Sequence, residues 1–201
     1  MPAPPVPAPV LLAGSSIFAE WATTDPAARS DRLCPDRRVD NQAVCGTQTP
    51  DWLPTLGPLV GAVRPAVLCL YVGSNDLANG RSVGRLLSNL DRLFDDALAA
   101  CPHTRLLYGS VIRSAHQSAR FGDLDAVNEA VARRLRPADR CGFVDLNPLF
   151  HAGGRLDGSL FQDDGVHLLP RAYARMLACL QPRIAAVASV RSAAIGGRGS
   201  G

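Results

Sequence analysis

Two consecutive serines near the end of an apolar run are the first candidates for chemistry in this chain. Residues 10–13, Val-Leu-Leu-Ala, have the length and composition of a buried strand, and Gly14 separates them from Ser15 and Ser16. Open α/β sheets carry their reactive groups where strands end, so a serine here is a candidate nucleophile. Gly-Ser-Ser also occurs in ordinary turns, and the interpretation therefore depends on partner residues elsewhere in the chain.

A histidine in the segment Asp-Asp-Gly-Val-His-Leu-Leu-Pro supplies the base that such a serine needs. The neutral imidazole of His167 can take a proton from a serine and later return it to a leaving group. Asp164, three residues earlier, can fold back onto the ring, hold its tautomer and stabilise the imidazolium. The alternative is an Asp-Gly turn followed by a surface histidine at the start of a helix.

Two further positions could stabilise negative charge on a substrate. Asn75 follows the apolar run 66–73, and its side-chain amide could donate to a developing oxyanion. Such a donor is worth on the order of 10²–10³ in rate. Gly46, in the segment Asn-Gln-Ala-Val-Cys-Gly-Thr, allows its backbone N–H to approach a substrate closely. Both positions are also consistent with ordinary turns or caps.

Alternating strands and helices must position these residues. Continuous apolar runs predict strands that are buried on both faces, as in a parallel sheet, at 10–13, 66–73, 104–112 and 142–146, with a weaker one at 39–44. Helical periodicity lies between them: a helix capped by Ser82, one capped by Asp123, one that begins at Pro170 and one over 49–63. This alternation predicts a three-layer α/β domain, for which a flavodoxin-like strand order is the natural expectation.

Composition fits one globular domain and excludes several classes of function. The 201 residues are 47% hydrophobic and 19% charged, with a net charge of +3. All 21 basic residues are scattered arginines, so there is no P-loop or Schiff-base lysine, and nucleic-acid binding has little support. We expect a proline-rich lead-in at 1–8, the domain at 9–187 and a disordered glycine-rich tail at 188–201.

Targeting and redox signals are weak. No stretch approaches the roughly 20 apolar residues of a membrane span, and the proline-rich start lacks the features of a signal peptide. The six cysteines are widely spaced and form no C-x-x-C pair, which favours structural thiols over a metal site. We therefore expect a cytoplasmic protein that needs no cofactor or metal, although an even number of cysteines leaves disulfides in an exported protein open.

The order of these signals resembles the SGNH hydrolases, also called GDSL esterases/lipases, over about residues 9 to 187. The resemblance implies a three-layer α/β/α sandwich with a five-stranded parallel sheet. It also implies hydrolysis of carboxylic esters, and in some members thioesters, without a metal. A small-molecule ester is then the expected substrate, while the sequence leaves its acyl and alcohol groups, and the oligomeric state, undetermined.

The resemblance assigns roles residue by residue. Ser16 matches the nucleophile because it directly precedes an aliphatic residue, and Asp164 and His167 match the family's D-x-x-H. Gly46 and Asn75 match the glycine and asparagine blocks, so the implied oxyanion hole consists of the Ser16 and Gly46 N–H groups and the Asn75 amide.

Two positions near the nucleophile carry further expectations. The family's first block usually reads Gly-Asp-Ser, and in this chain Ser15 stands where the aspartate is usual. Trp21 lies where one branch of the family carries a tryptophan, although core packing is the preferred explanation. The implied function is a serine esterase that works through an acyl-serine; an acyltransferase and a non-catalytic binding module on the same fold are the alternatives. We expect the segments 116–123 and 147–162 to shape the substrate pocket.

Overall fold

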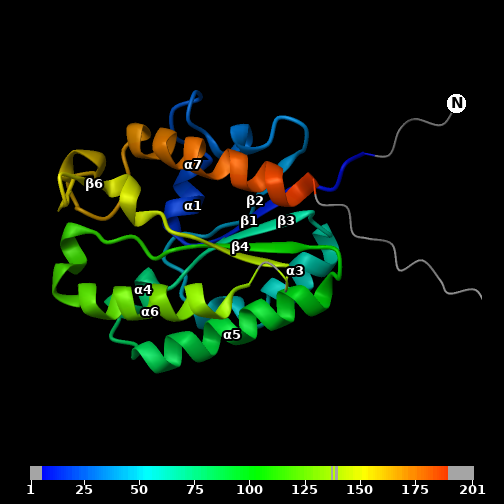
Figure 1. The fold of residues 1–201 in the computed structure, drawn as a ribbon, viewed down its shortest axis with the longest axis horizontal. Coiled ribbons are helices and arrows are strands. Elements are labelled where there is room, and N and C mark those ends of the chain that lie inside the picture. Colours follow the sequence, from blue (N-terminus) through cyan, green and yellow to red (C-terminus); the bar gives the residue numbers. More distant parts are fainter. Residues whose placement is uncertain (1–5, 137, 139, 190–201) are drawn as a thin grey trace, which may run out of the picture.

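Five parallel strands form the central sheet of the protein. The computed structural model describes residues 6–136, 138 and 140–189. The strands are β1 (Val10–Gly14), β2 (Val39–Asn41), β3 (Val67–Tyr71), β4 (Arg105–Gly109) and β5 (Cys141–Val144). Their order, β2-β1-β3-β4-β5, is the flavodoxin-like order that the sequence predicts. Because every neighbouring pair is parallel, the carboxyl ends of all five strands lie at one edge, toward the left in Figure 1.

Helices cover both faces of this sheet and confirm the predicted three-layer architecture (Figure 1). One face carries α1 (Ser16–Trp21), η1 (Ser30–Leu33) and α7 (Pro170–Ser189). The other carries α2 (Thr49–Trp52), α3 (Leu56–Val63), α4 (Ser74–Ala78), α5 (Val83–Ala100) and α6 (Phe121–Arg134). The remaining elements are η2 (Ala115–Arg120), η4 (Asn147–Phe150), η5 (Gly158–Leu160) and the hairpin of β6 (His151–Ala152) and β7 (Arg155–Leu156). Among the described helices, none is long and apolar enough to cross a membrane.

The two faces of each strand enter two separate cores. In β1, Val10 and Leu12 pack in the core under α1 and α7, whereas Leu11 and Ala13 pack in the core on the side of α3 and α5. Side chains alternate between the faces of a strand, so a sheet covered on both sides needs apolar residues at every position. This explains why the central strands β1 and β3 are continuous apolar runs, whereas the edge strand β2 is Val-Asp-Asn and only half-buried.

The structure confirms one of two predicted helix caps. Ser82 caps α5, its hydroxyl accepting a hydrogen bond from the Arg85 amide at 3.3 Å, as predicted. The cap predicted at Asp123 is wrong, because α6 already begins at Phe121, and Asp123 instead forms an ion pair with Arg120 at 2.8 Å.

A second difference from the prediction lies between α2 and α3, and a proline explains it. The single helix predicted over 49–63 is divided in two, with the break around Pro54, which cannot donate a helical hydrogen bond. Pro170 begins α7 as predicted. That helix continues to Ser189, so the first two residues of the predicted tail are helical, and 190–201 lie outside the described residues.

The two ends of the described chain meet at the amino edge of the sheet. The guanidinium of Arg37, just before β2, donates to the Ala8 carbonyl at 2.9 Å and to the Ala188 carbonyl at 3.4 Å. The segment before β1 and the end of α7 are thus held together by one side chain, at the edge opposite the carboxyl ends of the strands.

Gly14 controls the path of the chain from β1 to α1. Its φ is +128°, and a Cβ at this position would lie 1.8 Å from the carbonyl oxygen of Tyr71 in β3. The next residue, Ser15, donates its amide to that same carbonyl at 2.9 Å. Only glycine combines this backbone conformation with so close an approach.

We predict that Gly14→Ala lowers the free energy of unfolding by about 3 kcal/mol or more, because strain at positive φ adds to a backbone clash. The matched control is Gly84→Ala in α5, where an added Cβ meets no atom within 4 Å. Its helix propensity should raise stability by roughly 0.5–1 kcal/mol. Urea denaturation measures both, and equal stability of the two variants would contradict the assignment.

Candidate active site

Ser16 is the first residue of α1 and is held in place by the apolar side of that short helix. Ile17, Phe18 and Trp21 are buried in the core beneath α7. Trp21 is 0% exposed, and its ring stacks on Tyr173 at a centroid distance of 5.9 Å, so it is a packing residue. The Ser16 side chain is fixed at the carboxyl edge of the sheet because the rest of its helix is packed against this core.

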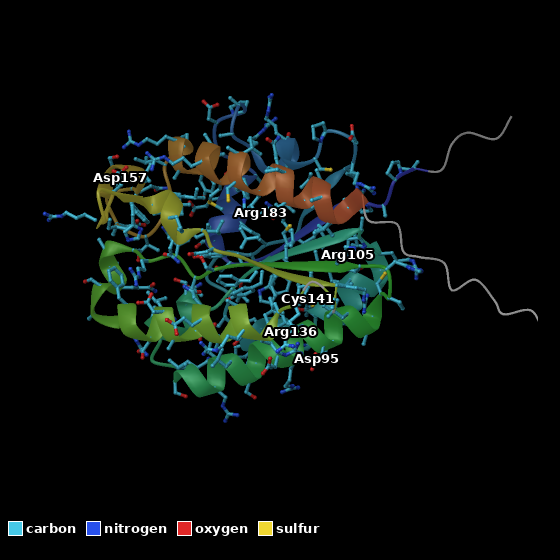
Figure 2. All side chains as sticks on the ribbon, viewed as in Figure 1. Asp95, Arg105, Arg136, Cys141, Asp157 and Arg183 are labelled. Carbon is cyan, nitrogen blue, oxygen red and sulfur yellow. The ribbon has the colours of Figure 1, made fainter. Side chains whose placement is uncertain are left out.

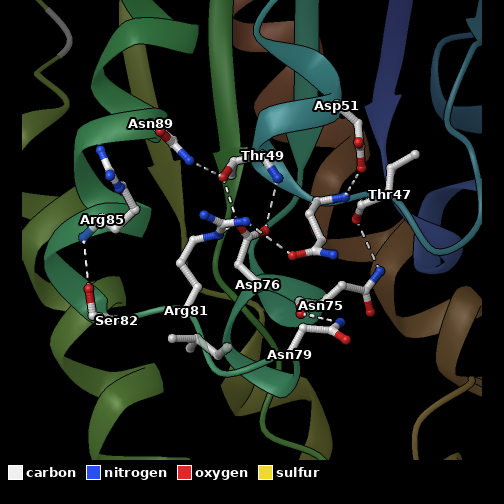
Figure 3. Close-up of polar contacts among 12 residues, drawn as sticks. Thr47, Thr49, Asp51, Asn75, Asp76, Asn79, Arg81, Ser82, Arg85 and Asn89 are labelled. Atoms are coloured by element: carbon white, nitrogen blue, oxygen red, sulfur yellow. Dashed lines mark hydrogen bonds and ion pairs between the residues drawn. The ribbon is translucent and has the colours of Figure 1, made fainter.

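The loop after β2 is hydrogen-bonded to the end of β1 and to α4. The Val44 amide and the Thr47 hydroxyl both donate to the Gly14 carbonyl, at 2.9 and 3.1 Å. Asn75 donates its side-chain amide to the Thr47 carbonyl at 3.0 Å (Figure 3). Gly46, with φ +78°, lies in this loop and is therefore held near Asn75 and the start of α1.

A small cavity of about 10 Å³ lies beside Ser16. Its lining includes Ser16 after β1, Asn75 after β3 and Val166, the residue before His167. Three of the chain segments singled out in the sequence therefore meet at one point. Gly46 is in the adjacent loop but does not line the cavity.

The lining of this cavity differs from the sequence-based expectation. The segments 116–123 and 147–162 contribute none of its residues. Ile112 and Ser114, in the extended segment after β4, do. Residues 147, 148 and 151 line a separate, larger hollow of about 480 Å³ beside α6. The sequence did not reveal that the segment after β4 lines the cavity, because its apolar residues indicate only a continuation of the strand.

Asp164 and His167 form a closed turn. His167 Nδ1 lies 2.5 Å from Asp164 Oδ2, and Asp164 Oδ1 accepts the backbone N–H groups of Val166 and His167, both at 2.9 Å. The hydrogen bond from the Val166 amide, followed by that from the His167 side chain, lowers the pKa of Asp164 to about 2. The carboxylate is therefore ionised and oriented toward the ring.

The other ring nitrogen of His167 faces a residue that the sequence reasoning missed. His167 Nε2 lies 3.3 Å from Glu20 Oε1, and Gln162 donates to the second oxygen of Glu20 at 3.4 Å. The described hydrogen bonds include none between the Ser16 hydroxyl and this imidazole. Ser16 and Glu20 are four residues apart on α1, and this spacing, which puts their Cβ atoms about 5–6 Å apart on one face, was the available signal.

A buried polar network fixes the helix that carries Asn75. Asp76 is 0% exposed, accepts the amide and hydroxyl of Thr49 at 2.9 and 2.5 Å, and lies 2.6 Å from Arg81 Nε. Asn89 of α5 donates to the Thr49 hydroxyl at 2.8 Å (Figure 3). The neighbour of Asn75 thus ties α4 to α2 and α5. Breaking such a buried charged network is strongly destabilising, so it holds Asn75 firmly.

The arginines near the site already have carboxylate partners. Arg113 pairs with Asp125, and Arg120 lies 2.8 Å from Asp123. The arginines labelled in Figure 2 lie on different elements: Arg105 on β4, Arg136 after α6 and Arg183 on α7. The basic residues therefore remain distributed along the chain, as in the sequence.

Comparison with known proteins identifies the family. The model of the GDSL-like lipase/acylhydrolase family matches residues 12–175, and the chain belongs to this family. No curated protein matches the sequence.

Solved structures share the fold at low sequence identity. A GDSL-like lipase from Bacteroides thetaiotaomicron is 20% identical with a TM-score of 0.72, and the match covers 89% of this chain and 88% of that one. A lipase/acylhydrolase from Enterococcus faecalis is 18% identical with a TM-score of 0.69, covering 88% and 95%. A carbohydrate esterase of family 3 from Talaromyces cellulolyticus is 17% identical with a TM-score of 0.70, covering 90% and 98%.

We predict that Asp164 stabilises the fold in a pH-dependent way. Because its pKa is lowered from 3.8 to about 2, its contribution is present above pH ~4 and is lost as the pH falls toward 2. Asp164→Asn should therefore be less stable than the natural protein at pH 6, and the difference should close near pH 2.

Asp163→Asn is the control, because Asp163 is exposed and makes no hydrogen bond or ion pair with the described residues. Unfolding by urea at several pH values measures the effect. A stability difference between Asp164→Asn and the natural protein that does not change with pH would contradict the prediction.

Proposed function

We propose that the protein is a serine esterase that hydrolyses carboxylic esters through an acyl-serine intermediate. One observation carries the proposal: Ser16 and Asn75 line one cavity with Val166, and the next residue, His167, is held by Asp164 against the helix that begins with Ser16. Membership of the acylhydrolase family agrees with this chemistry.

In the first step, His167 Nε2 takes the proton of the Ser16 hydroxyl as its oxygen attacks the ester carbonyl carbon. The carbonyl electron pair moves to the oxygen, which accepts hydrogen bonds from the N–H groups of Ser16 and Gly46 and from the Asn75 amide. Ser16 opens α1, so its N–H has no acceptor inside the helix. Asn75 uses one amide hydrogen on Thr47 and keeps the second for the oxyanion.

In the second step, the bond to the alcohol oxygen breaks and the alcohol leaves with the proton from His167. Water then gives its proton to His167 and attacks the acyl-serine, which releases the acid and restores Ser16. Asp164 remains an ionised acceptor for the ring throughout, because its pKa of about 2 lies far below neutral pH.

Ser15 acts through its backbone rather than as the nucleophile. It precedes α1 as the N-cap, its amide donates to Tyr71, and its carbonyl accepts the amides of Phe18 and Ala19 at 3.0 and 3.1 Å. These contacts are independent of the side chain at position 15, which explains how serine is accommodated where the family usually has aspartate.

We expect Ser16→Ala and His167→Ala to reduce kcat/KM for p-nitrophenyl acetate by on the order of 10³-fold or more, because each removes a member of the triad. Ser16→Ala should also abolish covalent labelling by a fluorophosphonate, whereas Ser15→Ala should remain labelled. The exposed Ser118→Ala in η2 is the control for unchanged activity. Labelling also separates an enzyme from a non-catalytic binding module. Undiminished hydrolysis by both triad variants would refute the proposal.

We expect Glu20→Ala to increase kcat/KM. The contact of Glu20 with Nε2 is a hydrogen bond only when that nitrogen carries a proton, whereas a general base needs it unprotonated. Both side chains are about one-third exposed, so the contact is weak and the gain should be up to about fivefold. Glu129→Ala on α6, which removes an exposed ion pair far from the site in sequence, is the control. A tenfold loss of activity in Glu20→Ala would show instead that Glu20 assists catalysis.

A further inference from the structure

The cavity beside Ser16 is about as large as a single water molecule. Its volume of about 10 Å³ compares with the roughly 10–15 Å³ that a cavity needs to hold one water. A methyl group is of similar size, whereas each further methylene of an acyl chain needs additional space. The cavity therefore limits what can lie next to the nucleophile on this side.

The walls of the cavity are part of the packed core and leave little room for adjustment. Tyr71 and Ile112 are 2% and 3% exposed, and the Ile112 amide donates to the Tyr71 hydroxyl at 3.3 Å. Ile17, also in the lining, is buried in the same core under α1. Protein cores are close-packed, so these side chains cannot move aside for a longer chain without cost.

Ser114 gives this cavity a polar group that the fold does not use. The residue is 3% exposed, it lines the cavity, and its hydroxyl oxygen is buried without a hydrogen-bond partner among the described residues. Ser74, which lines the same cavity, differs because its hydroxyl is hydrogen-bonded to Gln117. An unpaired buried hydroxyl lowers stability, so its retention calls for an explanation other than stability.

We propose that this cavity is the acyl subsite, that it accepts a two-carbon acyl group, acetyl, and that the Ser114 hydroxyl donates a hydrogen bond to the acyl oxygen. The proposal rests on the esterase function proposed above and specifies its substrate class. The acetyl methyl occupies the cavity while the carbonyl carbon bonds to Ser16 Oγ and the alcohol oxygen leaves. Ser114 then supplements the Asn75 amide as the negative charge develops.

Chain-length selectivity tests the size limit. The natural protein is assayed with p-nitrophenyl acetate, butyrate and hexanoate, and kcat/KM should fall at least about tenfold from acetate to butyrate, since one excess methylene costs 10-fold or more. Ile112→Ala should raise the butyrate-to-acetate ratio at least about tenfold by enlarging the cavity. Ile112→Val, a milder change, should raise it less and keeps the test valid if the alanine variant does not fold.

Ile184→Ala is the matched control for cavity size. It makes the same chemical change at a fully buried position of the same core, on α7, outside the cavity lining. Its butyrate-to-acetate ratio should equal that of the natural protein. Equal kcat/KM for all three esters in the natural protein would overturn the size limit and leave the esterase function intact. Absence of both hydrolysis and fluorophosphonate labelling would overturn the esterase function and the subsite with it.

Ser114→Ala tests the hydrogen bond. If Ser114 serves the substrate, kcat for p-nitrophenyl acetate should fall about tenfold or more with little change in KM, because the bond strengthens in the transition state. The melting temperature should stay the same or rise, since an unpaired hydroxyl is removed. Ser110→Ala is the structural counterpart: its hydroxyl accepts from the Leu146 amide at 2.8 Å, so its melting temperature should fall. Unchanged kcat in Ser114→Ala would overturn the role of Ser114.

Discussion

The close approach of the end of β1 to β3 is the constraint on which the candidate site depends. Gly14 allows it, and the hydrogen bond from the Ser15 amide to the Tyr71 carbonyl fixes it. The carbonyl of Gly14 then accepts two hydrogen bonds from the loop after β2, which is bonded in turn to Asn75. Gly14 thus connects the segments that follow β1, β2 and β3. The positions of the nucleophile and of the oxyanion donors therefore depend on one another.

The two halves of the site are held in different ways. Ser16 and Asn75 are fixed by buried neighbours, the first by the apolar side of α1 and the second through the ionic network of Asp76. His167 lies on a turn, its side chain is 30% exposed, and it contacts Glu20 at the surface. Preorganised donors stabilise developing charge without reorganisation. The base, in contrast, is held at a partly exposed turn by its contacts with Asp164 and Glu20.

The fold could be predicted well from the sequence because burial on both faces of the sheet leaves a strong local signal. The continuous apolar runs located four strands and a weaker pattern located β2, with ends displaced by at most three residues. The periodicity of α5 located that helix and its cap. The short helices α1 and α4, of six and five residues, were missed because they span less than two turns and show no periodicity. The order of Ser16, Asn75 and Asp164–His167 was informative because the carboxyl ends of parallel strands share one edge. Ser114 and the network of Asp76 could not be predicted, since their surroundings are set by tertiary packing, whereas the spacing of Glu20 from Ser16 was a usable signal.

The contact of Arg37 with both ends of the described chain has a practical meaning for handling the molecule. Ala8 and Ala188 meet at the amino edge of the sheet, on the opposite side from the opening beside Ser16. A purification tag, an immobilising resin or a fused domain joined next to Ala8 or Ala188 would therefore start at the edge of the sheet opposite the opening beside Ser16.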